Sequence, residues 1–293
     1  MLKLLALDRF TILLITMVIL ATFIPVSGQL AHYFNILTTV AIAILFFLHG
    51  AKLSREAVVE GMLHWKMHAL VFVFTFVIFP AIGLLAKPIL EPLLGQQLYW
   101  GFLFMCFLPS TVQSSIAFTS MAKGNVPAAV CSASASSLLG IFVTPILVSL
   151  VLAKGTGNSD LHGISKILLQ LLLPFVTGHL MQPWIGGFVT KHKKVLGIVD
   201  RGSILLVVYT AFSAAVIEHL WNTVPMSSLL GLLVSCMVIL AVALLGSRLI
   251  SRRLGFPVQD EITIVFCGSK KSLVSGVPMA KVLFAGAHLG PIL

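Results

Sequence analysis

Two adjacent lysines, Lys270 and Lys271, lie inside an otherwise apolar segment near the end of the chain. Serines flank them at Ser269 and Ser272, and glycines stand close by on both sides. Glycine weakens a helix and an ammonium group is costly at membrane depth, so a membrane segment of this composition is stable only around a wet cavity inside the protein. We therefore interpret residues 266–278 as a transport site.

A second polar interruption lies earlier in the chain, at residues 110–123. It aligns without a gap against residues 268–281, and both stretches end in Met-Ala-Lys. The alignment pairs Thr111 with Ser269, Gln113 with Lys271, and Ser114 with Ser272. Corresponding breaks in two apolar segments are typical of transporters built from repeats, whose binding sites lie near the membrane midplane. The sequence thus predicts one site built from both stretches.

The overall composition is that of a membrane protein. Of the 293 residues, 58% are hydrophobic and only 10% are charged, and the mean hydropathy is +1.07, which excludes an ordinary soluble domain. The net charge of +10 comes from basic residues in short loops rather than from a basic face interleaved with aromatic side chains. This charge is expected to set orientation in the membrane, and no nucleic acid is expected as a partner.

Catalytic and metal-binding patterns do not occur in the apolar segments. The four cysteines have neither paired spacing nor nearby histidines, so we expect buried thiols. The histidines, His68 among them, lack metal-ligand spacing and lie mostly at segment ends. No Ser-His-Asp or paired-carboxylate arrangement occurs at membrane depth, so we expect neither an enzyme nor a bound metal or other cofactor.

Nine apolar segments are long enough to span a bilayer, and a tenth begins near Ala287 and is cut off at Leu293. The nine run at about 10–27, 30–50, 67–87, 98–122, 126–153, 164–186, 202–219, 226–250 and 260–285. With Lys270 and Lys271 set aside from the 19 basic residues, 13 lie in the N-terminus and the even-numbered loops and 4 in the odd-numbered loops. This asymmetry predicts a cytoplasmic N-terminus.

Ten spans divide into two sets of five, residues 1–153 and 154–293, of which the second is expected to be incomplete because the tenth helix is truncated in this chain. Because five is odd, the second set enters the membrane from the opposite side, and the repeats are inverted. The fourth and ninth spans then run in opposite directions, so their breaks can cross near the midplane. We expect an all-α, polytopic protein of ten transmembrane helices in a plasma membrane or a bacterial inner membrane.

The motifs at the two breaks resemble those of the bile acid:sodium symporter family. They are residues 108–111, the pair at 114–115, residues 122–126 and residues 267–272. Residues 268–273, Gly-Ser-Lys-Lys-Ser-Leu, look like the branch of that family called sodium/bile acid cotransporter 7. The resemblance implies a transporter whose fourth and ninth helices are unwound and cross at the binding site.

The resemblance also implies where the sodium ligands of the family fall. A Ser-Asn pair falls on Ser114 and Ser115, a ninth-helix glutamate on Phe266, and a following Gln-Asn pair on Lys270 and Lys271. Hydroxyl positions of the fifth helix fall on Ala129 and Ala133, with Ser132 one place off, and a third-helix glutamine of a second sodium site falls on Thr75.

Hydroxyls beside two cations are a poor sodium site, because unit like charges about 4 Å apart repel by about 4 kcal/mol at an effective dielectric of about 20. Sodium binding is therefore not expected there, and we hypothesise that a lysine ammonium takes the place of the cation.

Less specific interpretations remain open for the same residues. Lys270 and Lys271 either face a cavity, where at least one pairs with an anionic substrate or exchanges a proton, or they reach an interface or lock the unwound helix through carbonyls. The polar side chains of the first stretch either line the site or join neighbouring helices; they are Thr111, Gln113, Ser114 and Ser115. The serine run 132–137 is expected to be a close-packing face, with Ser132 kept as a candidate ligand.

These observations together predict a secondary active transporter that moves a small organic anion by alternating access. Its site lies where helices four and nine cross, and its partners are the substrate and the lipid bilayer. The sequence does not fix an oligomeric state. The alternative belongs to another class: a membrane scaffold or regulator with the same fold that does not transport, in which the lysines fix one conformation.

Overall fold

Every element in the described part of the chain is a helix, in a computed structural model that describes residues 9–51, 64–156, 161–217 and 224–284. The first half contains α1 (Arg9–Phe23), α2 (Gly28–Ala51), α4 (Trp65–Val73), the π-helical turn η2 (Phe74–Ile78), α5 (Phe79–Leu85), α6 (Lys87–Leu94), α7 (Gln96–Phe107), α8 (Val112–Met121) and α9 (Val126–Thr156). The second half contains α10 (Leu161–Lys191), α11 (Lys193–Ile217), α13 (Met226–Arg253), α14 (Val258–Ser269) and α15 (Leu273–Leu283). The expected all-helical class is confirmed for these ranges, and the expected tenth segment lies outside them.

Five helical stretches are long and apolar enough to cross a membrane, or six if α7 and α8, which are bent by 63° relative to each other, form one span. The five are Gly28–Ala51, Trp65–Leu85, Val126–Val151, Lys194–Ile217 and Met226–Arg253. Within α13, a window of mean hydropathy 2.8 is only 11% buried in the protein, so side chains such as Met237 and Leu245 face outward. An apolar surface of this kind is stable in lipid rather than in water. The chain is therefore a multi-pass membrane protein.

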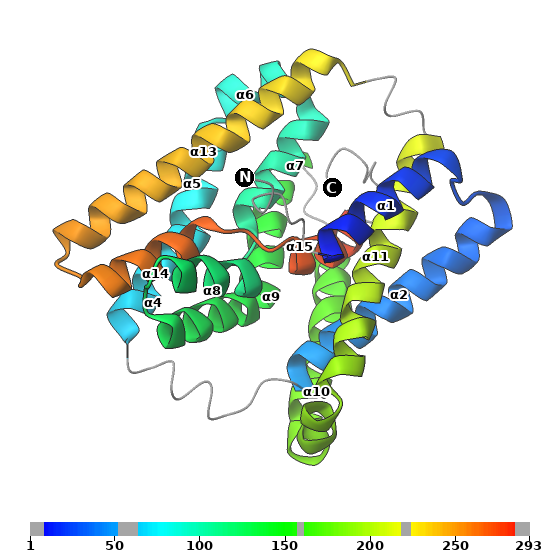
Figure 1. Cartoon of the computed structure of the whole chain (residues 1–293). Coiled ribbons are helices and arrows are strands. Elements are labelled where there is room, and N and C mark those ends of the chain that lie inside the picture. The colour runs from blue at the N-terminus through cyan, green and yellow to red at the C-terminus, as the bar shows by residue number, and fades with distance from the viewer. Residues whose placement is uncertain (1–8, 52–63, 157–160, 218–223, 285–293) are drawn as a thin grey trace.

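The helices form two groups that meet at α15 (Figure 1). The first group consists of α1, α2, α10 and α11, which lie together on the right in Figure 1. The second group contains α4 to α9 with α13 and α14, and α14 packs against α4, α8, α9 and α13. Because α15 contacts α10 and α11 as well as α9, the segment that follows the two lysines lies between the groups.

α2 and α10 pack with their backbones in contact at Gly50 and Gly178. A Cβ atom added to Gly50 would lie 2.0 Å from the carbonyl oxygen of Phe175, and one added to Gly178 would lie 2.0 Å from that of Phe47. Small residues of this kind let membrane helices approach closely. The contact joins a helix of the first half directly to a helix of the second half.

One connection is helical where a loop was expected. α10 extends to Lys191 and α11 begins at Lys193, so only His192 separates them, whereas the apolar segments end near 186 and resume near 202. An α-helix crosses the hydrocarbon core in about 20 residues and can continue into the headgroup region, where basic side chains are solvated. The apolar pattern therefore marks the part of each helix that lies in the hydrocarbon core rather than its full length.

Both segments with a polar interruption consist of two helices. Between α7 and α8, Leu108 is extended (φ −69°, ψ 150°) and Pro109 has no backbone N–H to continue the helix. Between α14 and α15, Lys270 is extended (φ −92°, ψ 140°). We call residues 108–111 the first break and residues 270–272 the second break.

Candidate functional site

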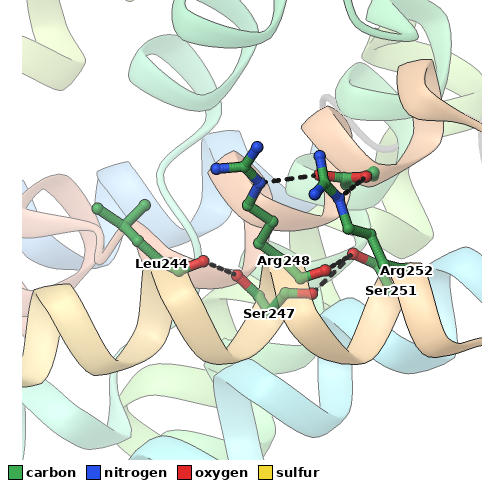
Figure 2. Close-up of polar contacts among 6 residues, drawn as sticks. Leu244, Ser247, Arg248, Ser251 and Arg252 are labelled. Atoms are coloured by element: carbon green, nitrogen blue, oxygen red, sulfur yellow. Dashed lines mark hydrogen bonds and ion pairs between the residues drawn. The ribbon is translucent and has the colours of Figure 1, made fainter.

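The start of α14 is fixed by a carboxylate that two arginines share. The Glu261 side chain is only 9% exposed, and its oxygens lie 3.3 Å from Arg248 Nε and 2.9 Å from Arg252 Nε of α13. Figure 2 shows the two arginines reaching from α13 to this contact, while Ser247 and Ser251 donate to carbonyls of α13 itself. Removing one partner of such a pair leaves a poorly compensated buried charge. This contact therefore positions the helix that leads to the second break.

Hydroxyl groups from the first half bind carbonyls of the second half. A helix end leaves carbonyls without a donor, and inside a membrane protein each of them needs one. Ser110 Oγ donates to the Cys267 carbonyl (2.6 Å), Ser115 Oγ to the Phe266 carbonyl (3.2 Å) and Thr111 Oγ1 to the Lys271 carbonyl (2.6 Å). In the opposite direction, the Ser272 N–H donates to the Pro109 carbonyl (2.9 Å). The two breaks therefore lie directly against each other.

α9 supports the first break with three hydroxyl side chains. Ser136 Oγ accepts from the Ser110 N–H (3.0 Å), and Ser137 Oγ donates to the Ser110 carbonyl (3.2 Å). About two helical turns further on, Thr144 Oγ1 donates to the Phe107 carbonyl (2.8 Å). Two serines of the run 132–137 thus do more than pack against a neighbour, because they satisfy both the N–H and the carbonyl of Ser110 within the break.

The ammonium group of Lys271 is enclosed by backbone carbonyls. Its Nζ donates to the carbonyls of Thr75 (2.9 Å), Cys106 (3.0 Å) and Leu108 (2.9 Å). An ammonium group has three N–H donors, so each of them has an acceptor. Nζ also lies 4.1 Å from the centroid of the Phe79 ring, at cation–π distance. Lys271 therefore connects the second break to the first break and to η2.

The Thr75 carbonyl is available because η2 cannot satisfy it. In this π-helical turn the Phe79 N–H donates to the Phe74 carbonyl, five residues back, instead of to Thr75. The next residue is Pro80, which has no N–H. Both helical donors for the Thr75 carbonyl are lost, and the lysine replaces them.

The other two acceptors come from the end of α7. In a continuous helix the Cys106 carbonyl would accept from the Ser110 N–H, which instead donates to Ser136 Oγ. Leu108 is extended, so its carbonyl has no helical donor either. Lys271 thus completes the hydrogen bonding that the break at Pro109 leaves open.

Lys270 has different surroundings. Its Nζ lies 4.4 Å from the centroid of the Phe118 ring and 6.0 Å from that of the Phe266 ring. These two rings stack at 5.6 Å with an interplanar angle of 23°. Within the described residues, no carbonyl or carboxylate accepts a hydrogen bond from this ammonium group. Phe118 is 41% exposed and Lys270 and Phe266 are half-buried, so the three side chains are partly accessible from outside the packed core.

The remaining predicted residues of the two stretches divide between surface and interior. On α8, Gln113 is exposed and Ser114 partly exposed, and across the described ranges neither side chain has a hydrogen-bond partner. Ser269 is 4% exposed, and its Oγ has no partner in the part of the chain that the structure describes. Ser272 caps α15, because its Oγ accepts from the Ser275 N–H (3.3 Å). The predicted residues thus surround the breaks, but they make different contacts.

A buried pair adds one residue that sequence reasoning missed. His68 Nδ1 lies 2.7 Å from Ser132 Oγ, and the two residues are 5% and 0% exposed. His68 is 64 residues away from Ser132 in the chain and has no metal-ligand spacing, so no signal in the sequence indicated this pairing. The hydroxyl of Thr75 is also engaged, because it donates to the Val71 carbonyl (2.8 Å). Each of these two hydroxyls thus has a hydrogen-bond partner inside the protein.

The geometry at the breaks combines one enclosed cation with one open cation. A carboxylate or sulfonate could pair with the open ammonium of Lys270, while an apolar part of the same molecule contacts the two phenylalanine rings. Neither break contains an acidic residue. The nearest acid in the sequence of α14, Glu261, is already paired with arginines. The site is suited to an anion with an apolar part.

Comparisons with known proteins match almost the whole chain. The sequence model of the SBF-like CPA transporter family matches residues 8–293. A Pseudomonas aeruginosa protein named "Uncharacterized protein PA2026" is 62% identical over 286 residues, which cover 97% of this chain and 86% of the relative. "Putative symporter YfeH" of Escherichia coli K12 is 55% identical over 288 residues, with the same coverage of 97% and 86%. "Sodium/bile acid cotransporter 7" of Danio rerio is 28% identical over 289 residues, covering 96% of this chain and 84% of the relative. The family match includes both breaks.

Proposed function

This chain belongs to the SBF-like CPA transporter family, and we propose that it is a secondary active transporter of a small organic anion. The family match and the cotransporter relative confirm the resemblance to the bile acid:sodium symporter family that the break motifs indicate. The family and the relatives named as symporters are transporters rather than enzymes. In this proposal the substrate crosses by alternating access, through movement of the two helix groups relative to each other.

The proposed architecture consists of two inverted repeats, residues 1–153 and 154–293, with five spans in each. This architecture is supported by the observation that each half contributes helices to both helix groups. The first two helices of each half, α1 and α2 and α10 and α11, form the first group, and the later helices of both halves form the second. The loop charge supports an N-terminus on the cytoplasmic side of a plasma membrane or a bacterial inner membrane. A cysteine that replaces Lys193 should react only from the cytoplasmic side, and reaction from outside would contradict this orientation.

The substrate site is proposed at Lys270, and the observation that carries it is the open ammonium group beside two stacked rings. The cation attracts the charged end of the substrate, and Phe118 with Phe266 provides the contact surface for its apolar part. The exposed Gln113 and the partly exposed Ser114, on α8 like Phe118, are proposed to add polar contacts. The name of the zebrafish relative makes a bile acid one substrate to test.

Lys271 is proposed to act as a built-in cation, so transport is expected not to require sodium. The ammonium is held by three carbonyl oxygens, the ligand type that hard cations prefer in proteins. One of these is the carbonyl of Thr75, the position that the family resemblance assigns to a second sodium site. At the other expected sodium position, Phe266 stands where the family resemblance places a glutamate, so the hydroxyls of Ser115 and Ser132 have no carboxylate from that position beside them.

Uptake into proteoliposomes tests these assignments. Purified protein would receive labelled organic anions, including a bile acid, under matched Na⁺ and K⁺ gradients. Lys270→Gln should lower uptake roughly tenfold or more because it removes a charged partner, while Lys270→Arg should retain most of the uptake. Lys87→Gln is the control for losing a cation elsewhere, because Lys87 forms an exposed ion pair with Glu91 on α6.

Each outcome of this assay has a stated meaning. Saturable uptake that Lys270→Gln lowers roughly tenfold or more and that is equal in both gradients supports transport, the site and sodium independence. Uptake that Lys270→Gln leaves unchanged refutes the proposed site. If folded protein takes up none of the anions in either gradient, the non-transporting scaffold or regulator becomes the better description.

A further inference from the structure

A separate pocket lies between α15 and the first helix group. It has a volume of about 300 Å³, and its lining includes Ser27, Ala31 and Asn35 around the start of α2, Ala214 of α11 and Lys281 of α15. That volume is at the small end of the range for pockets that bind organic molecules. The pocket is therefore large enough for a small ligand and too small for a bulky one.

Lys281 brings an incompletely paired cation to this pocket. Its Nζ donates to Asn35 Oδ1 at 2.8 Å. An ammonium group has three N–H donors, and the other two have no acceptor among the residues that the structure describes. This differs from Lys271, for which all three donors have carbonyl acceptors.

The Asn35 amide offers further donors at the same place. An ammonium group can only donate, so the side-chain oxygen of Asn35 must face Lys281. Its amino group, with two N–H donors, is then left without a partner in the described ranges. Lys281 and Asn35 together present several donors and one positive charge, which is the chemistry that binds an oxyanion.

Among the described residues, the rest of the lining contains no acidic side chain, and most of it is apolar, as at Val26, Ala31, Ala214 and Ile217. We propose that this pocket is a second binding site, which takes the carboxylate of a small soluble organic acid on Lys281 and Asn35. Apolar walls favour an acid with a short hydrocarbon or aromatic part over an inorganic anion.

The position of this pocket relates it to the proposed transport site, and in this respect the inference rests on the proposed function. Lys281 follows Ser272 by nine residues on α15, roughly 13 Å along the helix axis. The pocket and Lys270 are therefore separate sites, near the C-terminal end of α15 and just before its N-terminal end. A carboxylate bound at Lys281 occupies the boundary between the two helix groups, where a transported anion would enter or leave.

The reactivity of an introduced cysteine tests the pocket without any transport measurement. Ala214→Cys would be placed in full-length protein whose two partly exposed cysteines, Cys131 and Cys236, are replaced by alanine. Labelling rates with an anionic and a cationic thiosulfonate reagent would be compared in nanodiscs of zwitterionic lipid. Adding Lys281→Gln should lower the anionic-to-cationic rate ratio roughly tenfold, whereas Lys281→Arg should keep it.

Benzoate then serves as the probe for the bound acid. It should slow labelling of the cysteine at 214 several-fold in the protein that has Lys281 and should have no effect with Lys281→Gln. The matched control is Gln96→Cys, an exposed position at the start of α7, where benzoate and the lysine substitution should change nothing. Equal rate ratios with and without the Lys281 charge, or no protection by benzoate, would overturn the proposal.

Two further measurements distinguish a soluble acid from two other oxyanions, a lipid headgroup and a carboxylate of the protein itself. Nanodiscs with phosphatidylglycerol that protect the cysteine, when benzoate does not, would assign the pocket to a lipid headgroup and overturn the soluble acid. Glu218 follows Ile217 in the sequence, so protection by benzoate that appears only with Glu218→Gln would show an internal carboxylate instead and overturn the proposal. Lys270-dependent uptake without benzoate protection would reject this pocket alone, and protection without uptake would reject the transport proposal alone.

Discussion

The two breaks lie in corresponding segments of the two halves, yet only the second carries charged side chains. The first break and the end of α7 present carbonyls, at Cys106, Leu108 and Pro109, and carry no charge. The second break supplies the donors for all three, from the Lys271 ammonium and the Ser272 N–H. Two matching polar interruptions are therefore not two equal sites. Each supplies hydrogen bonds that the other lacks.

Within the second break, the side chains of Lys270 and Lys271 have different surroundings although they are chemically identical. Lys270 is extended, and in extended backbone successive side chains point to opposite sides. One lysine therefore enters the protein and meets three carbonyls, while its neighbour meets two aromatic rings. Backbone conformation rather than residue type decides which lysine is structural and which is open to a ligand.

Removing the enclosed lysine should have the largest effect. Lys271→Met leaves three carbonyls without a donor, and we expect a loss of about 3 kcal/mol or more, or roughly 6 °C or more in Tm. Lys270→Met is the matched control and should change Tm little, because its ammonium has no carbonyl partner in the described residues. Thermal unfolding of both variants in one detergent gives the comparison. Equal Tm values would mean that the two lysines do not differ as described.

A smaller effect is expected where glycines pack against the first break. A Cβ on Gly140 would lie 2.5 Å from Cβ of Pro109, whose ring cannot rotate away, so Gly140→Ala should cost about 1–3 kcal/mol. Gly276→Ala meets the Leu108 side chain at the same distance of 2.5 Å, but that side chain can rotate, so its cost should be lower. Gly187→Ala has open space and is the control. A larger loss of Tm at Gly276 than at Gly140 would contradict this ranking.

A paired substitution tests two positions that the sequence alignment pairs, Thr111 in the first break and Ser269 directly before the second break. Thr111→Val removes the donor to the Lys271 carbonyl and should cost about 1 kcal/mol. Ser269→Ala, at the position aligned with it, should be neutral or slightly stabilising, because its buried hydroxyl has no partner among the described residues. Denaturation of the two variants side by side measures the difference. A loss at Ser269 as large as that at Thr111 would show an unrecognised partner.

The smallest expected effect is that of sodium on the native protein. Exchange of Na⁺ for K⁺ at equal ionic strength should leave Tm unchanged, because an ion that binds the folded state would raise it and Lys271 already occupies the carbonyl cage. Lys271→Ala empties the cage and should gain a sodium-dependent rise in Tm. A saturable sodium effect on the native protein, or none on the variant, would count against a built-in cation.

The helical class and the places of both breaks could be predicted from the sequence, because hydropathy and the polar residues around 110 and 270 are local signals. The enclosure of Lys271 could not, because its acceptors at Thr75, Cys106 and Leu108 are backbone groups that have the same chemistry in every residue. In the sequence, only Pro80 and Pro109 indicate that these carbonyls lack helical N–H donors. The ten-span inverted count stays a prediction, since five or six spans meet the length and hydropathy criteria in the described ranges.

Contacts between side chains far apart in the sequence were likewise not predictable. His68 and Ser132 pair across 64 residues, and nothing in the local pattern of α4 distinguishes this histidine from one at a helix end. Gln113 and Lys271 align in sequence, yet the first is exposed and the second is enclosed by carbonyls. An alignment assigns equivalent places in the chain. The environment of each place depends on which helices pack there.

The π-helical turn at Thr75 has a consequence for how this protein tolerates mutation. The acceptor that Thr75 offers to Lys271 is a carbonyl, so a substitution there keeps the acceptor as long as the turn keeps its shape. Pro80 is neither the donor nor the acceptor of this hydrogen bond, yet Pro80→Ala restores an N–H that can compete for the Thr75 carbonyl. In a scan of all substitutions, changes at Pro80 and Lys271 should therefore weaken this hydrogen bond more than changes at Thr75, which accepts it. A scan restricted to the donor and acceptor residues would overlook Pro80.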